Sequence, residues 1–437
     1  MLSRTEGRWD MRTSPSLWLY RAVVWLALPV VVPLLWIRDR ITGKRRPPFR
    51  VRLAPRPPAT QPGGLLIQAV SVGEVEVARR LVAELELRGA EVPVMVTATT
   101  ATGLTLARGT IGRRHPVLPC PLDLPCSVRR VLEAARPRAL VLVETEIWPE
   151  LMHQAGRAGI PVAVVNGRLS EGSLARYRRI GPVLRSLLEP LSLVLVRDEQ
   201  DAARFSSLGV NQGRIRVAGN IKYDLEPDPT PLEWADTARA LAGDRPIVVV
   251  GSTMEGEEAQ VLGAVARLST TGRRVFTILA PRHPERFDGV AGMLRRRNVA
   301  FVRRSMLNGD HGPTDTLLLD TIGELARAYE LAAVAFIGGS LVPTGGHNPL
   351  EPAVWGTPVL SGHHVFNFQE VYDEMVSAGG ARLVADEDDL VEALGQWLED
   401  GDAARAAGVA ARSVVERNRG ATSFTVDTLL ELIDSGS

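Results

Sequence analysis

The stretch AVSVGEVEVARR, residues 69–80, decides the fold because two structural periods meet in it. A run of small and β-branched residues ends at Gly73, and the apolar residues after it recur three or four positions apart. The first pattern is typical of a strand and the second of a helix, and the glycine permits the turn between them. The stretch therefore predicts a strand, a tight turn and a helix, with the carboxylate of Glu74 at the turn.

The same unit recurs along most of the chain. Apolar runs alternate with segments of helical length and period, which is typical of a parallel sheet that helices cover on both faces. In the first half the predicted strands are 65–70, 92–97, 115–120, 139–144, 161–165, 191–196 and 214–219. In the second half they are 246–252, 274–280, 299–303, 316–320, 332–340, 357–362 and 381–385. From Asp386 onward the sequence reads as helical.

The chain is expected to form two domains. Its 437 residues exceed what one ordinary hydrophobic core can organise. The stretch EPDPTPLEW, residues 226–234, interrupts the alternation with three prolines. We therefore expect an α/β protein with two doubly wound, Rossmann-like parallel sheets, one in residues 45–225 and one in residues 226–437, the second with the terminal helices. Open α/β sheets bind ligands at the carboxyl ends of their strands, so we expect the site in a cleft between the domains.

Composition and spacing argue against several function classes. The net charge of +1 does not favour a nucleic-acid partner, because such binders carry a strong excess of basic residues. Cys120 and Cys126 are spaced as neither a zinc motif nor a CxxC redox pair, and the seven histidines form no ligand pattern, so we expect no metal site. No GxGxxG sequence follows a predicted strand, and this argues against a dinucleotide-dependent oxidoreductase.

Residues 15–40 form a predicted membrane anchor. The run AVVWLALPVVVPLLWI, residues 22–37, carries no charge and is bounded by Arg21 and by a group of basic residues after it. We expect those basic residues to hold the following domain on the cytoplasmic side. The run is slightly short for a perpendicular span, and Pro29 and Pro33 would kink it, so a spanning and a surface position both stay open. A buried core helix is the competing interpretation.

Acidic residues follow two strand ends in the first half. Glu74 is one, and the stretch VLVETEIWPE, residues 141–150, places Glu144 and Glu146 at the other. An acid in a first helical turn is favoured by about 0.3–1 kcal/mol, so helix capping alone could explain Glu74. A general base must instead keep a lone pair facing the substrate. Lys222 in GNIKYD is one of only two lysines, and its compact ammonium suits a leaving phosphate.

The second half contains stretches suited to an anionic ligand. Arg282 comes directly after a predicted strand, between prolines that stiffen the loop. In FIGGSLVPTGGHNPLEPAVWGTPVL, residues 336–360, glycine pairs allow close backbone approach, and residues 348–351 are expected to open a helix whose free N–H groups bind phosphate. DTIGELARAY, residues 320–329, offers a second such helix start.

Together these motifs resemble the family of 3-deoxy-D-manno-octulosonic acid (Kdo) transferases of lipopolysaccharide synthesis. The matching motifs run in order from residue 71 to 370: SVGE, LDLP, ETEIWP, NGRLS, GNIKYD, GSTMEGEE, PRHPERF, TIGEL, GGSLVPTGGHNPLEP and FNFQE. The resemblance implies a GT-B fold of two Rossmann-like domains with the acceptor bound by the first and the donor by the second. It implies an enzyme without metal or other cofactor on the cytoplasmic side of the cell inner membrane. The reaction it implies is inverting transfer of Kdo from CMP-Kdo to a lipid A precursor, lipid IVA, with release of CMP.

The resemblance also assigns roles to residues. It makes Glu74 the proton acceptor and makes Glu144 and Lys222 the groups that stabilise the transition state. It assigns CMP binding to Pro281, Arg282, Ile322, Gly323, Glu324, Asn348, Pro349, Leu350 and Glu351. Three positions depart from the family pattern: Gln68 and Met254 stand where histidine is usual, and Gly167 stands where alanine is usual.

Two other function classes stay open from sequence. One is a different GT-B nucleotide-sugar enzyme, such as a MurG-type transferase or a UDP-sugar epimerase, which UDP rather than CMP would protect against heat. The other is a membrane-tethered binding protein without turnover. An enzyme should lose its rate on Glu74→Ala, whereas a binding protein should show no such loss.

Overall fold

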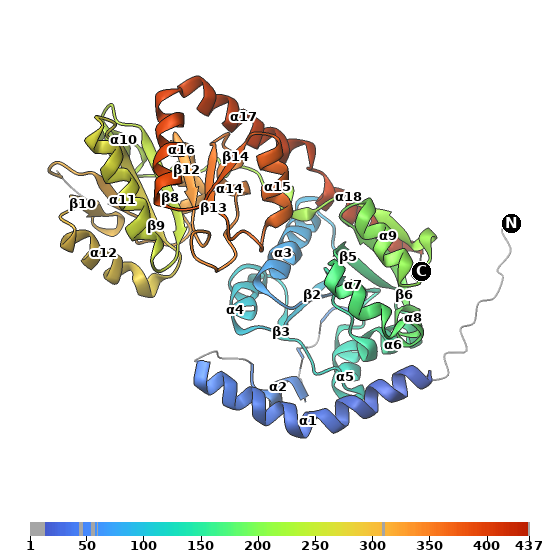
Figure 1. Cartoon of the computed structure of the whole chain (residues 1–437). Helices are drawn as coiled ribbons and strands as arrows, with labels where there is room; N and C mark the ends of the chain where they lie inside the picture. Colours follow the sequence, from blue (N-terminus) through green and yellow to red (C-terminus); the bar gives the residue numbers. More distant parts are fainter. Residues whose placement is uncertain (1–13, 43–46, 54–56, 59, 308–310, 436–437) are drawn as a thin grey trace. The chain divides into compact units, whose positions relative to one another are not determined.

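A computed structural model gives the fold and describes residues 14–42, 47–53, 57–58, 60–307 and 311–435 (Figure 1). The chain divides into two compact units. The first contains the chain up to Lys222 together with Arg419–Ser437, and the second contains Tyr223–Asn418.

The first unit is built on a sheet of seven parallel strands in the order β3-β2-β1-β4-β5-β6-β7. The strands are β1 (Leu65–Ala69), β2 (Val94–Ala98), β3 (Val117–Pro119), β4 (Ala139–Val143), β5 (Val162–Gly167), β6 (Leu191–Val196) and β7 (Ile215–Val217). Each lies within a residue or two of a predicted strand, so the sequence reading of this half is confirmed.

Helices cover both faces of this sheet. They are α3 (Val72–Leu87), α4 (Ala101–Thr110), α5 (Pro125–Ala135), α6 (Pro149–Arg157), α7 (Glu171–Arg178), α8 (Gly181–Leu188), α9 (Glu199–Ser207) and α18 (Ala421–Ser435). Helices α1 (Pro15–Thr42) and α2 (Phe49–Leu53) belong to the same unit and pack on this layer, α1 on α6 and α8 and α2 on α5. Alternate residues of a strand point to opposite faces. Ile67 accordingly joins a core with α3, α4 and α18, whereas Leu66 joins a separate core with α5, α6, α8 and α9.

The second unit repeats the architecture with seven parallel strands in the order β10-β11-β9-β8-β12-β13-β14. They are β8 (Ile247–Thr253), β9 (Phe276–Pro281), β10 (Phe301–Arg303), β11 (Thr316–Leu318), β12 (Val334–Ile337), β13 (Val359–Gly362) and β14 (Ala381–Val384). The covering helices are α10 (Ala235–Ala242), α11 (Glu257–Thr270), α12 (Phe287–Arg296), α13 (Leu325–Ala328), α14 (Leu350–Ala353), α15 (Gln369–Ser377), α16 (Glu387–Glu399) and α17 (Gly401–Arg417). Two doubly wound sheets are therefore present, as predicted.

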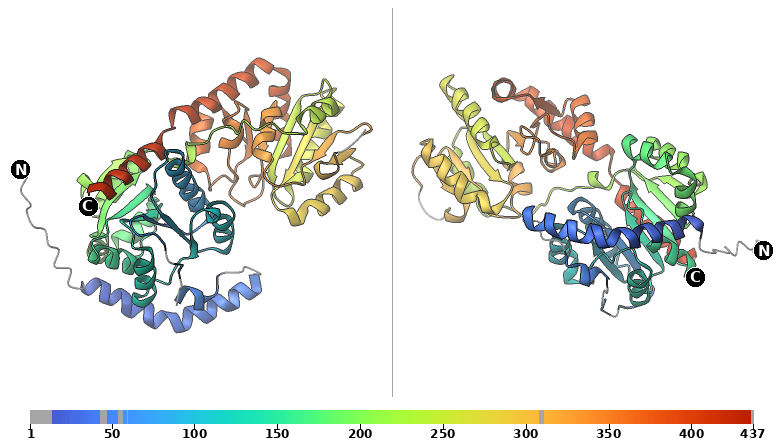
Figure 2. Two further views of the ribbon diagram at one scale, coloured as in Figure 1. Left: turned by 180° about the vertical axis from the view of Figure 1, so that it is seen from behind. Right: turned by 60° about the horizontal axis from the view of Figure 1, so that its bottom comes forward.

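The packing differs from the predicted domain limits at the C-terminus. Helix α18 returns to the first unit, where Val426, Leu429 and Ile433 enter the core beside α3 (Figure 2). The predicted boundary at residue 226 also lies just after the observed one at Tyr223, and Trp234 at the end of the proline-rich stretch is buried in the second unit. The prolines mark an irregular segment correctly. They carry no information on which unit a later amphipathic helix will cover.

Helix α1 covers the whole of the predicted anchor and continues to Thr42. The segment Pro15–Leu34 is long and apolar enough to cross a membrane, with a mean hydropathy of 1.8. Pro29 and Pro33 both lie inside the helix. The proline- and arginine-rich stretch that follows, residues 43–64, lies partly outside the described residues, and its described part includes α2.

Candidate active site

Glu74 lies in the first turn of α3, directly after the carboxyl end of the central strand β1. Its carboxylate accepts hydrogen bonds from the backbone N–H of Val70 at 2.7 Å and from that of Ser71 at 3.2 Å. The Ser71 hydroxyl donates to the same carboxylate at 2.9 Å. The capping role that competed with catalysis is thus present. A carboxylate has about four lone-pair sites, so three donors still leave room for a substrate hydroxyl.

The electrostatics of Glu74 suit proton transfer near neutral pH. The side chain is 5% exposed, and burial raises its pKa to about 7, assisted by the negative charges of Glu146 and Glu144. The hydrogen bonds from Val70 and Ser71 act in the opposite direction and are outweighed. A base works best when its pKa lies near the working pH. The same carboxyl can therefore cap the helix and exchange a proton.

Glu144 and Lys222 are distant in sequence, and the fold brings them together. The Lys222 ammonium lies 3.2 Å from the Glu144 carboxylate, and each side chain is about one quarter exposed. Glu144 directly follows β4 and adopts a left-handed backbone conformation, with φ of 58°, which is uncommon for a residue other than glycine. Asn166 holds the other partner in place, since its side-chain oxygen accepts from the N–H of Ile221 at 3.0 Å.

Glu146 belongs to the same group of acids and has no role in the sequence-based assignment. Trp148 donates its indole N–H to this carboxylate at 2.9 Å. Burial raises the pKa of Glu146, and the charge of Glu144 raises it further. The signal in the sequence was the pair of acids in ETEIWP, which exceeded what helix capping requires. The structure adds that Glu146 is the charge that most strongly raises the pKa of Glu74.

Two departures from the family pattern have a packing context. A Cβ atom at Gly167 would lie 3.2 Å from the carbonyl oxygen of Leu195 and 3.3 Å from Phe205, so this position is tight even for alanine. Gln68 is buried on β1, where its side-chain oxygen accepts from Thr97 at 3.4 Å. Its Nε2 has no hydrogen-bond partner within the described part of the chain. At Met254 the backbone N–H donates to Glu257, a contact independent of the side chain.

The predicted CMP-binding segments all lie at the carboxyl edge of the second sheet. Pro281–Arg282 ends β9, residues 322–324 follow β11, and residues 348–351 follow β12. Arg282 is exposed. Burial and then the positive charges of Arg282 and His283 lower the pKa of His347 to about 4, which places the β9 and β12 loops side by side. His347 is thus neutral at physiological pH, and its Nε2 is buried without a partner among the residues described.

The Glu324 side chain is hydrogen-bonded to other residues of the second unit. Its carboxylate accepts from the indole N–H of Trp234 at 2.9 Å, from Arg304 at 3.0 Å and from the Thr321 hydroxyl. Burial alone would raise its pKa, but these donors outweigh burial and the pKa is lowered. Ile322 beside it is largely exposed, and Gly323 has a φ of 90°. The carboxylate of the 322–324 segment is therefore already engaged within the second unit.

The two helix starts predicted to bind phosphate are short. Helices α13 and α14 each have four residues, and α14 begins at Leu350 instead of Asn348. Asn348 caps this turn by accepting from the N–H of Leu350 at 3.1 Å. The predicted start of the second helix at Asn348 is therefore corrected to Leu350, and phosphate binding at these two turns stays a prediction.

Glu257 determines the shape of the glycine-rich loop and was missed in the sequence. The side chain is 0% exposed and accepts four backbone N–H groups, from Met254 at 2.8 Å, Gly339 at 2.6 Å, and Ser340 and Leu341 at 2.8 Å. These N–H groups are consequently engaged within the protein. The neighbouring Glu258 forms a buried ion pair with Arg286. The consecutive acids of GSTMEGEE, residues 251–258, were the available signal.

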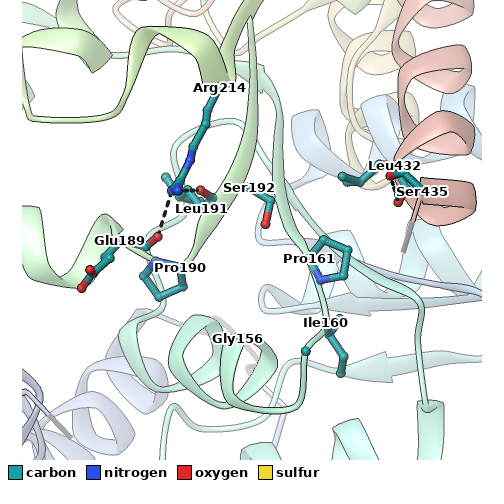
Figure 3. A pocket seen from close by; sticks show the side chains of 11 residues that line it. Gly156, Ile160, Pro161, Glu189, Pro190, Leu191, Ser192, Arg214, Leu432 and Ser435 are labelled. Carbon is teal, nitrogen blue, oxygen red and sulfur yellow. Dashed lines mark hydrogen bonds between the residues drawn. The ribbon is translucent and has the colours of Figure 1, made fainter. Parts of the chain in front are cut away.

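A further hollow lies at the opposite, amino edge of the first sheet (Figure 3). It has a volume of about 430 Å³ and lies between the starts of β5 and β6 and the end of α18. The guanidinium of Arg214 donates there to the carbonyl oxygens of Glu189 at 3.1 Å and Leu191 at 2.7 Å. None of the predicted site residues lines this hollow. Within the described residues no three His, Cys, Asp or Glu side chains gather as metal ligands would, and the absence of a metal requirement stays a prediction.

Comparisons with known proteins agree with these features. A family model described as 3-deoxy-D-manno-octulosonic-acid transferase (kdotransferase) matches residues 45–225. The 3-deoxy-D-manno-octulosonic acid transferase of Haemophilus influenzae is 35% identical over 413 residues, covering 92% of this chain and 96% of that protein. The protein of the same name from Bordetella pertussis is 36% identical over 426 residues, covering 94% and 98%. Among solved structures, UDP-GlcNAc 2-epimerase from Neisseria meningitidis shares 15% identity with a TM-score of 0.56, covering 84% of this chain and 100% of that one. At that identity the likeness shows the fold alone.

Proposed function

Because the chain belongs to the family of 3-deoxy-D-manno-octulosonic acid transferases and is a glycosyltransferase of GT-B fold, we propose that it transfers Kdo from CMP-Kdo to lipid IVA. In this reaction an acceptor hydroxyl attacks the anomeric carbon of Kdo. The bond from that carbon to the CMP phosphate breaks, and its electron pair leaves on the phosphate oxygen. The configuration at the anomeric carbon inverts.

Glu74 is the residue that carries this proposal. Its carboxylate takes the hydroxyl proton as the new glycosidic bond forms, and a pKa of about 7 lets it be ionised and yet basic at physiological pH. Lys222, held by Glu144 at 3.2 Å, balances the negative charge that develops on departing CMP. Positioning and charge stabilisation then supply most of the rate enhancement.

The second unit is proposed to hold the nucleotide. Arg282 offers an exposed cation to the phosphate, and the segments 322–324 and 348–351 border the same sheet edge. For the membrane, α1 is proposed as the anchor that keeps both units on the cytoplasmic side of the cell inner membrane, where a lipid acceptor is within reach.

The test is incubation of the full-length chain with CMP-Kdo and lipid IVA, followed by mass analysis of the lipid and measurement of released CMP. We expect lipid IVA to gain Kdo in step with CMP release. Glu74→Gln should lose this activity, whereas Glu76→Gln, at a half-exposed acid of the same helix that pairs with Arg79, should keep it. If the lipid is unchanged, or if UDP protects the protein against heat better than CMP, the proposed donor and reaction are wrong.

A further inference from the structure

Helix α1 packs against the first unit along one face. Leu17 is 1% exposed, and Tyr20, Arg21, Val24 and Leu28 are half-buried, so the shielded positions recur every three or four residues. The neighbours are α6 and α8, both water-soluble helices of the sheet's outer layer. Figures 1 and 2 show α1 lying along the outside of this unit. The helix therefore has an inner face that belongs to the protein.

An ion pair fastens this inner face. The Arg21 guanidinium donates two hydrogen bonds to the Glu150 carboxylate, at 2.7 and 2.9 Å. Glu150 is 0% exposed, and Gln154 donates to it as well, at 2.7 Å. A buried carboxylate that loses its cation stays behind as an uncompensated charge, so the helix cannot lift away without a large penalty.

A second contact lies one residue earlier. The Tyr20 hydroxyl donates to Asp123 at 2.7 Å. Asp123 also accepts the backbone N–H groups of Glu150 and Leu151, both at 2.9 Å, and so caps the start of α6. We call the contacts of Tyr20 with Asp123 and of Arg21 with Glu150 the clasp. The clasp joins α1 to the start of the helix that follows the Glu144–Trp148 loop.

The outer face of α1 is apolar and exposed. Its large apolar side chains more than 40% exposed are Trp18, Leu19, Val23, Trp25, Leu26, Val30, Val31, Leu34 and Ile37. Arg38 and Arg40, near the end of the same helix, are exposed cations. Apolar side chains bordered by cations are the composition of a helix that lies in the headgroup region of an anionic bilayer.

Resting on the membrane location proposed above, we propose that α1 does not cross the bilayer. It lies in the plane of the membrane surface, with its inner face fixed to the first unit by the clasp and only its outer face among the lipids. A spanning helix of about 20 residues would have hydrocarbon on all sides over about 30 Å. Here the clasp and the packing on α6 and α8 fall within the same apolar segment, Pro15–Leu34, and those helices cannot enter hydrocarbon.

Cysteine labelling in membranes of the expressing bacterium distinguishes the two positions. Ser16→Cys is made with Cys126→Ser, and the unaltered chain, whose exposed Cys126 lies in the first unit, serves as the marker. With a membrane-impermeant maleimide, we expect both cysteines to react in inverted inner-membrane vesicles and neither in intact spheroplasts. Reaction of the cysteine introduced at position 16 only in spheroplasts would show a spanning helix and overturn the proposal. This readout requires no turnover, so it is independent of whether Kdo is transferred.

The clasp itself is tested by distance measurement. Spin labels at Ser16→Cys and native Cys126 should give one narrow distance distribution on vesicles of zwitterionic and anionic phospholipid. The double variant Tyr20→Phe and Arg21→Gln should broaden it severalfold. A broad distribution in the parent, or none of this broadening in the variant, contradicts the clasp.

The outer face supplies the matched control. Trp25→Glu with Leu26→Glu should reduce the fraction bound to those vesicles at least tenfold while leaving the distance distribution narrow. If the chain instead forms a dimer in solution that these substitutions dissociate, the outer face binds a second copy and lipid is the wrong occupant.

Discussion

At the scale of the residue, Glu74 combines two roles that the sequence presented as alternatives. Its carboxylate closes the first turn of α3, and the same burial that this requires raises its pKa to about 7 from an ordinary 4.5. In the range between these values the folded protein binds a proton that the unfolded chain does not. The contribution of Glu74 to the free energy of unfolding is therefore fully present below about pH 4.5 and is lost as the pH rises through about 7.

The first prediction concerns pH. The rate at low substrate should rise with pH and level off above about 7, because Glu74 must be ionised to accept a proton. Glu74→Gln should lower the rate by about 10²–10⁴-fold and abolish this ionisation from the profile. It should also flatten the dependence of the free energy of unfolding on pH between about 4.5 and 7. A variant that keeps the parent's pH profile would show that another group is the base.

Glu146→Gln is a separate test of the same site. Removing this negative charge should lower the pKa of Glu74, so the rising limb of the profile should move to lower pH. Glu76→Gln, at a half-exposed acid, is the control and should leave the rising limb in place. Because the expected change is in the position of the limb, a general loss of folded protein would not imitate it.

The pair of Glu144 and Lys222 leads to a third prediction. Lys222→Met should lower kcat by about 10²–10³-fold, as expected when one preorganised charge is taken from a transition state. The Kd for CMP should change little, since the segments proposed to bind CMP lie in the other unit. A large rise in the Kd for CMP with unchanged kcat would assign Lys222 to ground-state binding instead.

At the scale of the element, the loop after β12 depends on a side chain from another part of the unit. Glu257→Gln replaces one carboxylate oxygen, a hydrogen-bond acceptor, by an NH₂ group that cannot accept hydrogen bonds from the backbone N–H groups around it. We expect a loss of about 1–3 kcal/mol for each donor left without an acceptor, and weaker CMP binding with it. Glu255→Gln, an exposed neighbour, is the control. Thermal unfolding with and without CMP measures both effects, and unchanged CMP protection would separate this loop from the donor site.

Helix α18 gives the fifth prediction. Leu429→Ala should cost about 2–5 kcal/mol, because the leucine is fully buried in the core of the first unit. The loss should appear in the unfolding of the first unit and leave CMP binding by the second intact. Phe424→Ala on the exposed side of the same helix should cost far less.

At the scale of the whole molecule, local periodicity was enough to find all fourteen strands of the two sheets, because each buried strand reads as an apolar run. The rule that parallel strands end at one edge places Glu144 and Lys222 on the same side of the sheet, but their contact across β5 and β6 was not predicted. The unit that α18 joins could not be predicted, because an amphipathic stripe fits either sheet. The four backbone N–H groups that donate to Glu257 could not be predicted either, because no periodicity in the sequence indicates that a carboxylate will accept hydrogen bonds from a distant loop.

The return of α18 has a consequence for biosynthesis. The ribosome delivers this helix only after the entire second unit. Until then the hydrophobic face of the first sheet beside α3 lacks Val426, Leu429 and Ile433 and stays open to water. The amino-terminal half, although made first, can complete its folding only after the second unit has been synthesised, so a nascent chain stalled near residue 400 should be the form that chaperones recognise and proteases remove.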